Sequence, residues 1–575
     1  MSADILLNYF NRISEAPDAI PRFRRFILDL AVRGKLTEQR NSEESVEELL
    51  YLIHSEKAQT IKRSSRKKCN PSKPIIVDEQ PFPAPLQWRF IRVGDFLEMI
   101  NGRAFKPTEW REHGLPIVRI QNLNKIHAPF NYCDPGSVED RHLIHDDDFL
   151  ISWSGTPGTS FGAFIWNRGL AALNQHIFRC IQVRNIFAAN FLKLAINSQL
   201  DVLIAQAQGG VGLQHVTKGT LESLPLPLPP LAEQHRIVAK VDELMELCDQ
   251  LQAAKNEREA KRDRLVASSL NRIITTKADE AQDVTRFHLG QLPRLTTRVE
   301  HIKLLRKTIL NLAVKGRLVS QSPHDEPAAE LLKRIWHEQL NLIKSGVLKD
   351  RTTLIEQEKR EQLFSIPVEW RWVKLAEIIT FGPQNGISPK EIKDEKAPKA
   401  ITLTATTSGN FNSKYFKHVE LNEENCESYW LSDGDVLFQR GNTREYVGTA
   451  AIFEGPMKAF IFPDLMIRVR FSSLLNLRYI HMALVSPPLR CYFSTNATGA
   501  SATMPKINQA VLLNTPIPLP PLAEQNRIVT KVDELMALCD KIERQLTTTE
   551  TDSRRLLEAV LRDALDSSAV AIGLK

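Results

Sequence analysis

The sequence lacks the motifs that mark most nucleotide-dependent and hydrolytic enzymes. It has no GxxxxGK followed by Ser or Thr, and its glycine cluster Gly209-Gly210-Val211-Gly212 neither follows a clear strand nor opens a helix, which argues against ATP hydrolysis and dinucleotide binding. HExxH and GxSxG are absent. Ser486-Pro487-Pro488-Leu489 is a poor substitute for the Asn/Asp-Pro-Pro-aromatic motif of amino-methyltransferases, and no Glu/Asp-x-Lys follows Pro463-Asp464 as in nucleases. We therefore predict no catalytic residues and no cofactor or metal site in this chain.

Disulfide, membrane and secretion signals are missing as well. The seven cysteines are odd in number and form no CxxC pair, which argues against a disulfide framework or a zinc site. No run approaches 18 apolar residues, so no membrane span is expected. The segment Met1–Asn8 lacks a basic n-region and a cleavage site. These absences predict a cytoplasmic protein.

Charge does not identify a partner. The net charge is +7 on 575 residues, which permits a polyanionic partner without requiring one. Residues 88–230 hold 13 Lys and Arg against 12 Asp and Glu, and residues 370–520 hold 16 against 13. DNA binding cannot be concluded from this balance.

A block of 27 residues occurs twice. Residues 225–251 and 516–542 differ at six positions and are 291 residues apart, so one domain-sized unit is used twice. Residues 24–36 recur as 306–318, and Trp88 recurs as Trp370, both at an offset of 282. The intervening regions, 95–220 and 377–511, share only short patches. The similar parts predict one structural role performed twice, and the divergent parts predict two different targets.

Each 27-residue block predicts the start of a long helix. Proline followed by Leu231-Ala232-Glu233-Gln234 is favoured at a helix start, and apolar residues then recur at alternating steps of four and three. This seam predicts helices over 231–275 and 521–565, each about 65 Å long, that pair with each other; the alternative is packing on a globular core. The seam residues are Ile237, Val241, Leu244, Cys248 and Leu251, and Ile528, Val532, Leu535, Cys539 and Ile542. The two cysteines are expected to be buried packing residues.

Other elements follow from local signals. Helices are expected near Pro21–Gly34 and Val299–Gly316, with glycine at the C-terminal cap. Residues 61–68 are strongly basic and precede a Pro-rich stretch; they predict a linker, or alternatively an arm that contacts phosphate. Strands are expected at Leu115–Ile120, Asp148–Trp153 and Ala450–Phe453, separated by glycine-rich turns.

The paired Pro-Leu-Pro-Pro-Leu-Ala-Glu-Gln-x-Arg-Ile-Val segments, at 227–238 and 518–529, resemble those of the specificity (S) subunit of Type I restriction–modification enzymes. The resemblance covers nearly the whole chain. Asp148–Gly162, followed by Asn174-Gln175-His176, resembles a segment common in that family's target-recognition domains, and the second copy departs from it around Phe462-Pro463-Asp464.

The resemblance implies a mixed α/β (α+β) fold with a pseudo-twofold internal repeat, in which long antiparallel coiled-coil helices separate two target-recognition domains. Each domain would read one half of a bipartite double-stranded DNA target, and the helices would set the spacer. Two modification (M) subunits would bring S-adenosylmethionine, and restriction (R) subunits would bring ATP and Mg. The expected divisions are an N-terminal helical region (1–60), a basic, Pro-rich linker (61–84), recognition domain 1 (85–229), a central helical region (230–350), recognition domain 2 (351–520) and a C-terminal helix (521–575).

Base readout needs Arg for guanine and Asn or Gln for adenine, presented on loops. The candidate DNA contacts are Arg119, Gln121, Asn122, Ser154, Thr156, Thr159, Asn174, Gln175 and His176 in the first domain, and Arg440, Asn442, Thr443, Arg444 and Lys506 in the second. The candidates for helix packing or subunit contact are Glu233, Gln234, Ile237, Val241, Leu244, Leu251, Glu524, Gln525, Ile528, Val532, Leu535 and Ile542.

Several alternatives stay open. Each candidate contact is otherwise an ordinary surface or turn residue, and Gly155, Gly158 and Gly441 are expected to form turns rather than phosphate cradles. The whole chain is otherwise an enzyme with an unfamiliar active site, or a duplicated protein–protein adaptor without DNA readout. If the helices set the spacer, a heptad inserted after Leu251 keeps the seam while lengthening the helix, whereas four residues break it.

Overall fold

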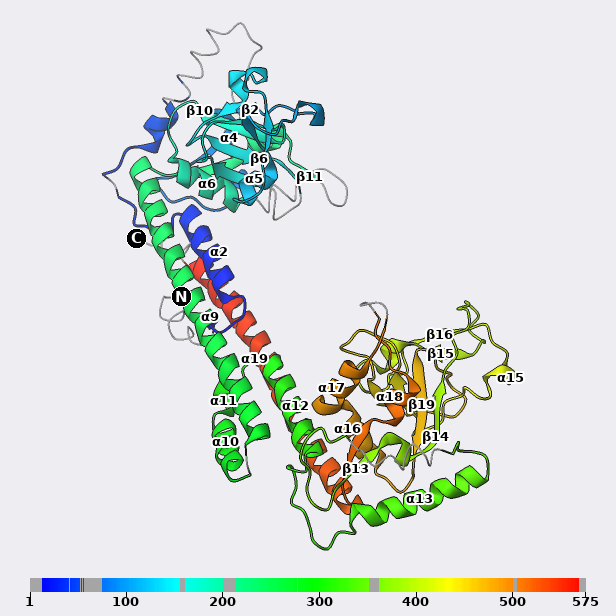
Figure 1. The fold of residues 1–575 in the computed structure, drawn as a ribbon. Helices are drawn as coiled ribbons and strands as arrows, with labels where there is room; N and C mark the ends of the chain where they lie inside the picture. The colour runs from blue at the N-terminus through cyan, green and yellow to red at the C-terminus, as the bar shows by residue number, and fades with distance from the viewer. Residues whose placement is uncertain are drawn as a thin grey trace. The chain divides into compact units, whose positions relative to one another are not determined.

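The computed structural model describes residues 13–40, 42–51, 53, 55, 75–155, 161–199, 214–276, 278–350, 361–499 and 504–567. They belong to two compact units, Met1–Glu257 with Thr549–Lys575, and Arg258–Thr548. Two long helices, α9 (Leu231–Thr275) and α19 (Leu522–Ser567), contribute to both units (Figure 1). They are the helices predicted over 231–275 and 521–565. Among the described residues, no helix has the length and apolar content needed to cross a membrane.

The first unit is built around a four-stranded antiparallel sheet with the order β2-β10-β6-β8 (Figure 1). Strand β6 is buried at every position because both faces of the sheet are covered. Phe149 and Ile151 face the cluster that contains α6, whereas Leu150 faces a second sheet. The strands are β2 (Leu97–Asn101), β10 (Ile177–Gln182), β6 (Phe149–Ser152) and β8 (Gly162–Ile165).

Smaller elements complete this domain. A second sheet has the order β4-β3-β9-β5, and two short ribbons, β1-β12 and β7-β11, bring distant segments together. These strands are β4 (Asn131–Cys133), β3 (Leu115–Val118), β9 (Ala171–Leu173), β5 (Leu143–Ile144), β1 (Arg89–Arg92), β12 (Pro225–Leu228), β7 (Ser154–Gly155) and β11 (Gln214–His215). The helices are α2 (Ala19–Val32), α4 (Val93–Phe96), α5 (Ile120–Asn124), α6 (Ala189–Ser198) and α8 (Lys218–Ser223).

The second unit repeats the main sheet and one ribbon. Its sheet order is β14-β19-β17-β18, and β13 pairs with β20 as β1 pairs with β12. The strands are β13 (Arg371–Lys374), β14 (Ile379–Asn385), β15 (Lys399–Ile401), β16 (Phe416–His418), β17 (Val436–Gln439), β18 (Ala450–Ile452), β19 (Met466–Phe471) and β20 (Pro516–Leu519). The helices are α10 (Ala278–Gly290), α11 (Leu292–Leu295), α12 (Val299–Val314), α13 (Ala328–Lys344), α15 (Glu423–Cys426), α16 (Leu477–Val485), α17 (Pro487–Asn496) and α18 (Gln509–Leu513). The mixed fold and its duplication are therefore confirmed.

The seams of the long helices pack on short helices of the same unit. Ile237, Val241 and Cys248 share a buried cluster with side chains of α2. Ile528, Val532 and Cys539 share one with side chains of α12. Both cysteines are buried, as predicted. Since these described contacts give each seam a partner in its own unit, direct pairing of the two long helices stays a prediction.

The predicted glycine caps are present at the ends of α2 and α12. Gly34 and Gly316 have φ values of +67° and +65°, a left-handed conformation that glycine adopts without steric cost. A Cβ on Gly316 would lie 2.5 Å from Pro367 Cγ and 3.0 Å from Trp370 Cζ2. The chain therefore turns at these glycines with no room for a side chain. The predicted basic linker, 61–68, lies outside the described residues.

Candidate nucleic-acid interface

Three candidate segments of the first domain meet at one end of its sheets. The Asn174 amide donates to the Val118 carbonyl over 3.1 Å, and the Trp153 amide donates to the His176 carbonyl over 3.4 Å. Segments 119–122, 153–155 and 174–176 are thereby neighbours. The sequence identified all three, but only the fold brings them together.

Two candidates in this group, Asn122 and Ser154, are buried. Asn122 is fully buried; its Oδ1 accepts from the Arg119 amide over 3.0 Å, and its Nδ2 donates to the Ala128 carbonyl over 3.1 Å. Ser154 is 2% exposed, at the point where β7 pairs with β11. These side chains shape the loops from inside, so neither is placed to contact a base. Thr156 and Thr159, together with Gly158, lie outside the described residues.

The other first-domain candidates retain some exposure. Gln121 is exposed. Among the described residues, the only hydrogen bond found for its side-chain amide is a long one, in which Nε2 donates to the Pro129 carbonyl over 3.5 Å. Asn174, Gln175 and His176 are half-buried, and so is Arg119, whose guanidinium lies 5.8 Å from the Trp110 ring. Their contact with bases stays a prediction.

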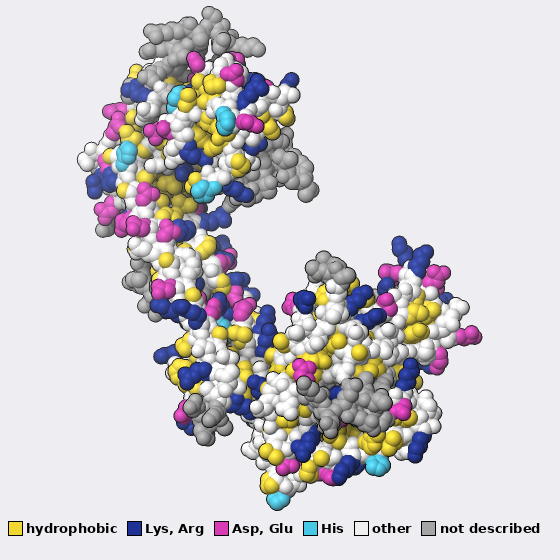
Figure 2. All heavy atoms as spheres, viewed as in Figure 1, with side chains coloured by type: hydrophobic (Ala, Val, Ile, Leu, Met, Phe, Trp, Pro, Cys, Tyr) yellow, Lys and Arg dark blue, Asp and Glu magenta, His cyan; other side chains and the backbone are white. Residues whose placement is uncertain are grey.

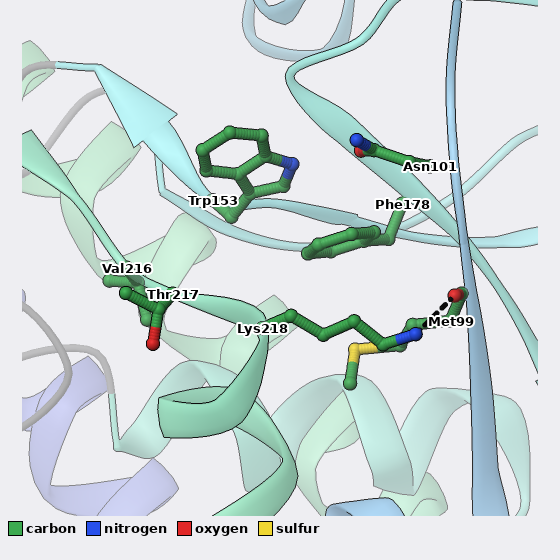
Figure 3. Close-up of a pocket in the computed structure, with 7 residues that line it drawn as sticks. All are labelled: Met99, Asn101, Trp153, Phe178, Val216, Thr217 and Lys218. Carbon is green, nitrogen blue, oxygen red and sulfur yellow. Dashed lines mark hydrogen bonds between the residues drawn. The ribbon is translucent and has the colours of Figure 1, made fainter. Parts of the chain in front are cut away.

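The sequence did not single out the aromatic pocket beside these segments (Figure 3). The Trp153 ring stacks on Phe178, with centroids 5.7 Å apart, and lies 5.6 Å from the His176 ring. Lys218 reaches along the pocket and donates to the Met99 carbonyl over 3.0 Å. The cavity has a volume of about 360 Å³ and is lined by Met99, Asn101, Trp153, Phe178, Val216, Thr217 and Lys218. Its residues come from four separate segments, so no local sequence pattern could have identified it.

The second domain presents its candidates on one loop, residues 440–446. Gly441 pairs with Lys506, and the Ile507 amide donates to the Arg440 carbonyl over 2.8 Å. The structure thus brings Lys506 to the loop, although the two are more than 60 residues apart in sequence. Thr443, Arg444 and Lys506 are exposed, and Arg440 is half-buried.

Asn442 differs from the other candidates on this loop. Its Nδ2 donates to Gln439 Oε1 over 2.7 Å, and its Oδ1 accepts from the Thr443 amide over 2.7 Å. Both polar groups of the side chain are therefore used inside the domain. A two-point contact with adenine, which was the reason to select Asn442, would have to break or share these bonds.

The repeated Pro-Pro-Leu-Ala-Glu-Gln motif is a buried clasp between helix and domain. Trp88 Nε1 donates to Glu233 Oε2, and Trp370 Nε1 donates to Glu524 Oε2, both over 2.9 Å. Gln39 and Gln321 donate to the other oxygen of Glu233 and Glu524, over 2.6 and 2.8 Å. The same three-residue arrangement therefore occurs in each unit, which explains why the sequence is so similar in the two copies.

The glutamine of the motif closes the clasp on the recognition domain. Gln234 accepts from the Ala188 amide over 2.8 Å and donates to the Ile186 carbonyl over 2.9 Å. Gln525 accepts from the Asn476 amide over 3.0 Å and donates to the Pro520 carbonyl over 3.0 Å. The helix-packing role predicted for this motif agrees with these contacts. The Glu and Gln side chains of the motif are buried, whereas Ala232 and Ala523 are exposed.

Burial raises the pKa of both clasp carboxyls. The pKa of Glu524 is raised by loss of solvent, against the lowering effect of hydrogen bonds from Gln321 and Trp370. Burial also raises the pKa of Glu233, against hydrogen bonds from Trp88 and Thr37. In each clasp, burial therefore disfavours the ionised glutamate, and the hydrogen-bond donors favour it.

The remaining features of the two domains are their potential metal ligands and their surface charge. Among the described residues, no group of three His, Cys, Asp or Glu side chains is placed to hold a metal ion. On the face shown in Figure 2, basic and acidic side chains are interspersed over both recognition domains. The geometry offers hydrogen-bonding loops on rigid sheets.

A family model described as the Type I restriction modification DNA specificity domain matches residues 85–259 and again residues 367–549. The chain belongs to this family. Each match runs from just before the clasp tryptophan into the long helix. The specificity-domain unit therefore includes the recognition domain, the tryptophan and the Glu-Gln pair of the clasp, and the first half of α9 or α19, whereas Gln39 and Gln321 lie outside it.

Individual relatives cover nearly the whole chain. It is 27% identical over 567 residues to the Type I restriction enzyme EcoEI specificity subunit of Escherichia coli, covering 95% of this chain and 94% of that protein. It is 28% identical over 562 residues to the EcoAI specificity subunit of Escherichia coli, with the same coverage. Among solved structures it is similar to the HsdS subunit from Thermoanaerobacter tengcongensis, with 18% identity, coverage of 85% of this chain and 99% of that chain, and a TM-score of 0.39.

Proposed function

We propose that this chain is the non-catalytic DNA-specificity subunit of a Type I restriction–modification complex, in which each recognition domain reads one half of a bipartite target. The observation that carries the proposal is the duplicated specificity domain: two copies of one sheet and one clasp, with different loops. A repeated scaffold with divergent loops suits the reading of two different short sequences. Exposed donors such as Gln121 on α5 and Arg444 on the 440–446 loop are of the types that read base edges.

The catalytic steps of such a complex would belong to partner subunits. Modification subunits would bind S-adenosylmethionine and methylate adenine, and restriction subunits would use ATP and Mg to translocate and cut DNA. With DNA as its target, the chain would act in the cytoplasm. Similar surfaces in the two units support two copies of one modification subunit, one per repeat.

Exposed leucines at equivalent positions support this stoichiometry. Leu247 on α9 is 50% exposed, and its equivalent Leu538 on α19 is 55% exposed. Leu86 and Val368 are a second equivalent pair, 83% and 86% exposed. Because large apolar side chains repeated on the surface of both units have no role in the core, they suit a partner that binds twice.

A domain exchange tests the proposal. Residues 89–228 should be replaced by the equivalent segment of a relative, with Trp88 and Glu233 kept so that the clasp is unchanged. Methylation profiling of DNA from cells that also carry the partner subunits should show one half of the target changed and the other half intact. The reciprocal exchange of residues 372–519 should change the other half. If neither half changes, the chain is an adaptor without DNA readout; if both halves change together, the domains are not independent readers.

A further inference from the structure

A fully buried glutamine lies beneath the loop that carries most second-domain candidates. Gln439 is the last residue of β17 and is 0% exposed. Its Nε2 lies 2.8 Å from the Leu403 carbonyl, 3.0 Å from Thr406 Oγ1 and 3.1 Å from Thr407 Oγ1. A buried amide is costly unless its groups are hydrogen-bonded. Gln439 meets this condition by joining two segments that are distant in sequence, 403–407 and 440–446.

The hydrogen bonds around Gln439 form a chain with one direction. Gln439 Oε1 accepts from Asn442 Nδ2 over 2.7 Å, and Asn442 Oδ1 accepts from the Thr443 amide over 2.7 Å. A flipped Gln439 amide would place its oxygen against the Leu403 carbonyl and its NH₂ group against the Asn442 NH₂ group. The network therefore fixes the orientation of both amides and, through them, the backbone at Thr443.

Helix α17 holds the other end of the same loop. Arg490 Nη2 donates to the Glu445 carbonyl over 2.8 Å, and Arg444 Nη1 donates to the Ser494 carbonyl over 3.0 Å. A Cβ on Gly448 would lie 2.5 Å from Phe493 Cβ. With both ends held, the exposed side chains of Thr443 and Arg444 project from a backbone that has little freedom to move.

The first domain has a different residue at the equivalent position. Ser152 ends β6 and pairs with Ile177 of β10, as Gln439 ends β17 and pairs with Met466 of β19. Ser152 is 2% exposed, and its hydroxyl has no hydrogen-bond partner among the described residues. The serine at this position joins no such network. The glutamine network is therefore a feature of the second domain rather than of the shared scaffold.

We propose that Gln439 is a positioning residue for sequence reading by the second domain: it locks the 440–446 loop to the 403–407 segment, so that Thr443, Arg444 and the exposed Thr404 form one DNA-facing surface. This proposal rests on the proposed function. Pre-organised groups discriminate better because they do not rearrange to accept a wrong base. Loss of the network should therefore reduce discrimination in one half-site and leave the other unchanged.

The test uses the full chain assembled with its modification partners and compares Gln439→Met with the wild type. Methionine has a similar volume but cannot replace the hydrogen bonds. Binding is measured by competition with duplexes that carry one wrong base pair in either half of the target. A wrong base pair typically weakens binding by about 5- to 150-fold. For Gln439→Met this factor should fall at least threefold in the half read by the second domain, with no change in the other half. Ser152→Ala, the matched control, should leave both factors unchanged.

Asn442→Ala removes the same hydrogen bond from the Asn442 side. Because Asn442 is half-buried, this variant should fold and can be tested even if Gln439→Met does not fold. The double variant should lose no more discrimination than either single variant, because the two side chains act through one contact. Equal discrimination by Gln439→Met and wild type overturns the proposal. So does an equal loss in both halves, which indicates a general structural effect. Failure of the wild type to discriminate in either half instead refutes the proposed function itself.

Discussion

The glycine after α12 provides a quantitative test of how the helical part joins the recognition domain. We predict that Gly316→Ala strongly destabilises the second unit. Gly316 has φ of +65°, where an alanine costs about 1–2 kcal/mol. The new Cβ would also lie 2.5 Å from Pro367 Cγ and 2.8 Å from Pro367 Cδ, inside any normal contact distance. Both contacts are with a rigid proline ring, so relief requires movement of the backbone.

The steric part of this cost adds to the conformational part. Overpacking of a filled site typically costs about 1–3 kcal/mol, so the total for Gly316→Ala is about 2–5 kcal/mol. Gly346 is a matched control in the same unit: its φ is +77°, and a Cβ added there would meet no described atom within 4 Å. Gly346→Ala should therefore cost only about 1–2 kcal/mol, the conformational part alone. Gly34 and Gly169 form the corresponding pair in the first unit.

Because the chain has two units, a single unfolding midpoint is not a sound measure. Hydrogen exchange of amides in β13 and α12, followed across a urea series, reports the free energy of opening at the affected junction. Gly316→Ala should lower this free energy at the junction by more than Gly346→Ala does, and amides in the first unit should be unaffected. Equal effects of the two substitutions would refute the reasoning, because they would show that Pro367 gives way without cost.

Two further predictions concern the helices and the clasp. Leu247→Glu and Leu538→Glu, each at an exposed position, should each remove one of the two modification subunits from the complex. Mass measurement of each variant complex should show one bound modification subunit. Two bound modification subunits would contradict the docking role of these leucines. Glu524→Gln should remove a pH-dependent cost: the pKa of Glu524 is raised in the folded protein, so the folded state binds the proton more tightly and stability falls as pH rises above the ordinary value of 4.5. Hydrogen exchange of amides in β13, followed across a urea series at each pH, should show the free energy of opening of the variant rising relative to the wild type from about pH 4 toward neutrality. A constant difference would argue against the burial effect.

Sequence periodicity was sufficient for elements whose signal is local. The starts of α9 and α19, the glycine caps at Gly34 and Gly316, and strands such as β6 follow from capping, spacing and composition over short windows. The seam correctly predicted the burial of residues such as Ile237, Val241 and Ile528, but it was wrong for Leu251, which is 38% exposed. It did not identify the partner, because an a/d pattern fits any apolar helix of suitable length.

The functional candidates were harder to predict because exposure is a tertiary property. Asn122 and Ser154 have the right chemistry for base contact, yet the fold buries both. Gln439 was not selected, although its contacts with Thr406 and Asn442 organise the loop that was. No window of sequence shows that residues 403–407 and 440–446 adjoin. The offset of 287 that aligns Ser152 with Gln439 is already present in the sequence, where Asp146–Leu150 resembles Asp433–Leu437, and the paired strands agree with it.

The role of the helices as a spacer can be tested only with both of them. The first unit contains residues 231–257 of α9 and 549–567 of α19, and the second unit contains the rest of both helices. α2 packs against both helices, through residues such as Ile237 and Leu557. A heptad after Leu251 alone would lengthen one connection and not the other. Insertions after Glu257 and Thr548 together lie at the boundaries of the units. Insertions at these boundaries leave the contacts of each seam with α2 or α12 unchanged within its unit. The number of inserted residues therefore need not be a multiple of seven to preserve those contacts.

Rotation then decides which insertion works, if the helices run along the DNA. Seven residues add about 10 Å but turn the helix by only about −20°, whereas the three base pairs of matching length turn by about 100°. Four residues add about 6 Å and turn by about 40°. One base pair adds about 3.4 Å and turns by about 34°, and two add about 6.8 Å and turn by about 70°. We therefore predict that the double four-residue insertion remains active and prefers a spacer one or two base pairs longer, because its errors in length and rotation are small for both. The double heptad insertion should bind weakly at every spacer length, because one domain faces away from its half-site. Binding to duplexes with spacers of graded length measures both outcomes. Tight binding of the heptad protein to a spacer three base pairs longer would show that bending or twisting of the DNA absorbs the rotational mismatch. An unchanged spacer preference in both insertion proteins would show that the helices do not set the spacer.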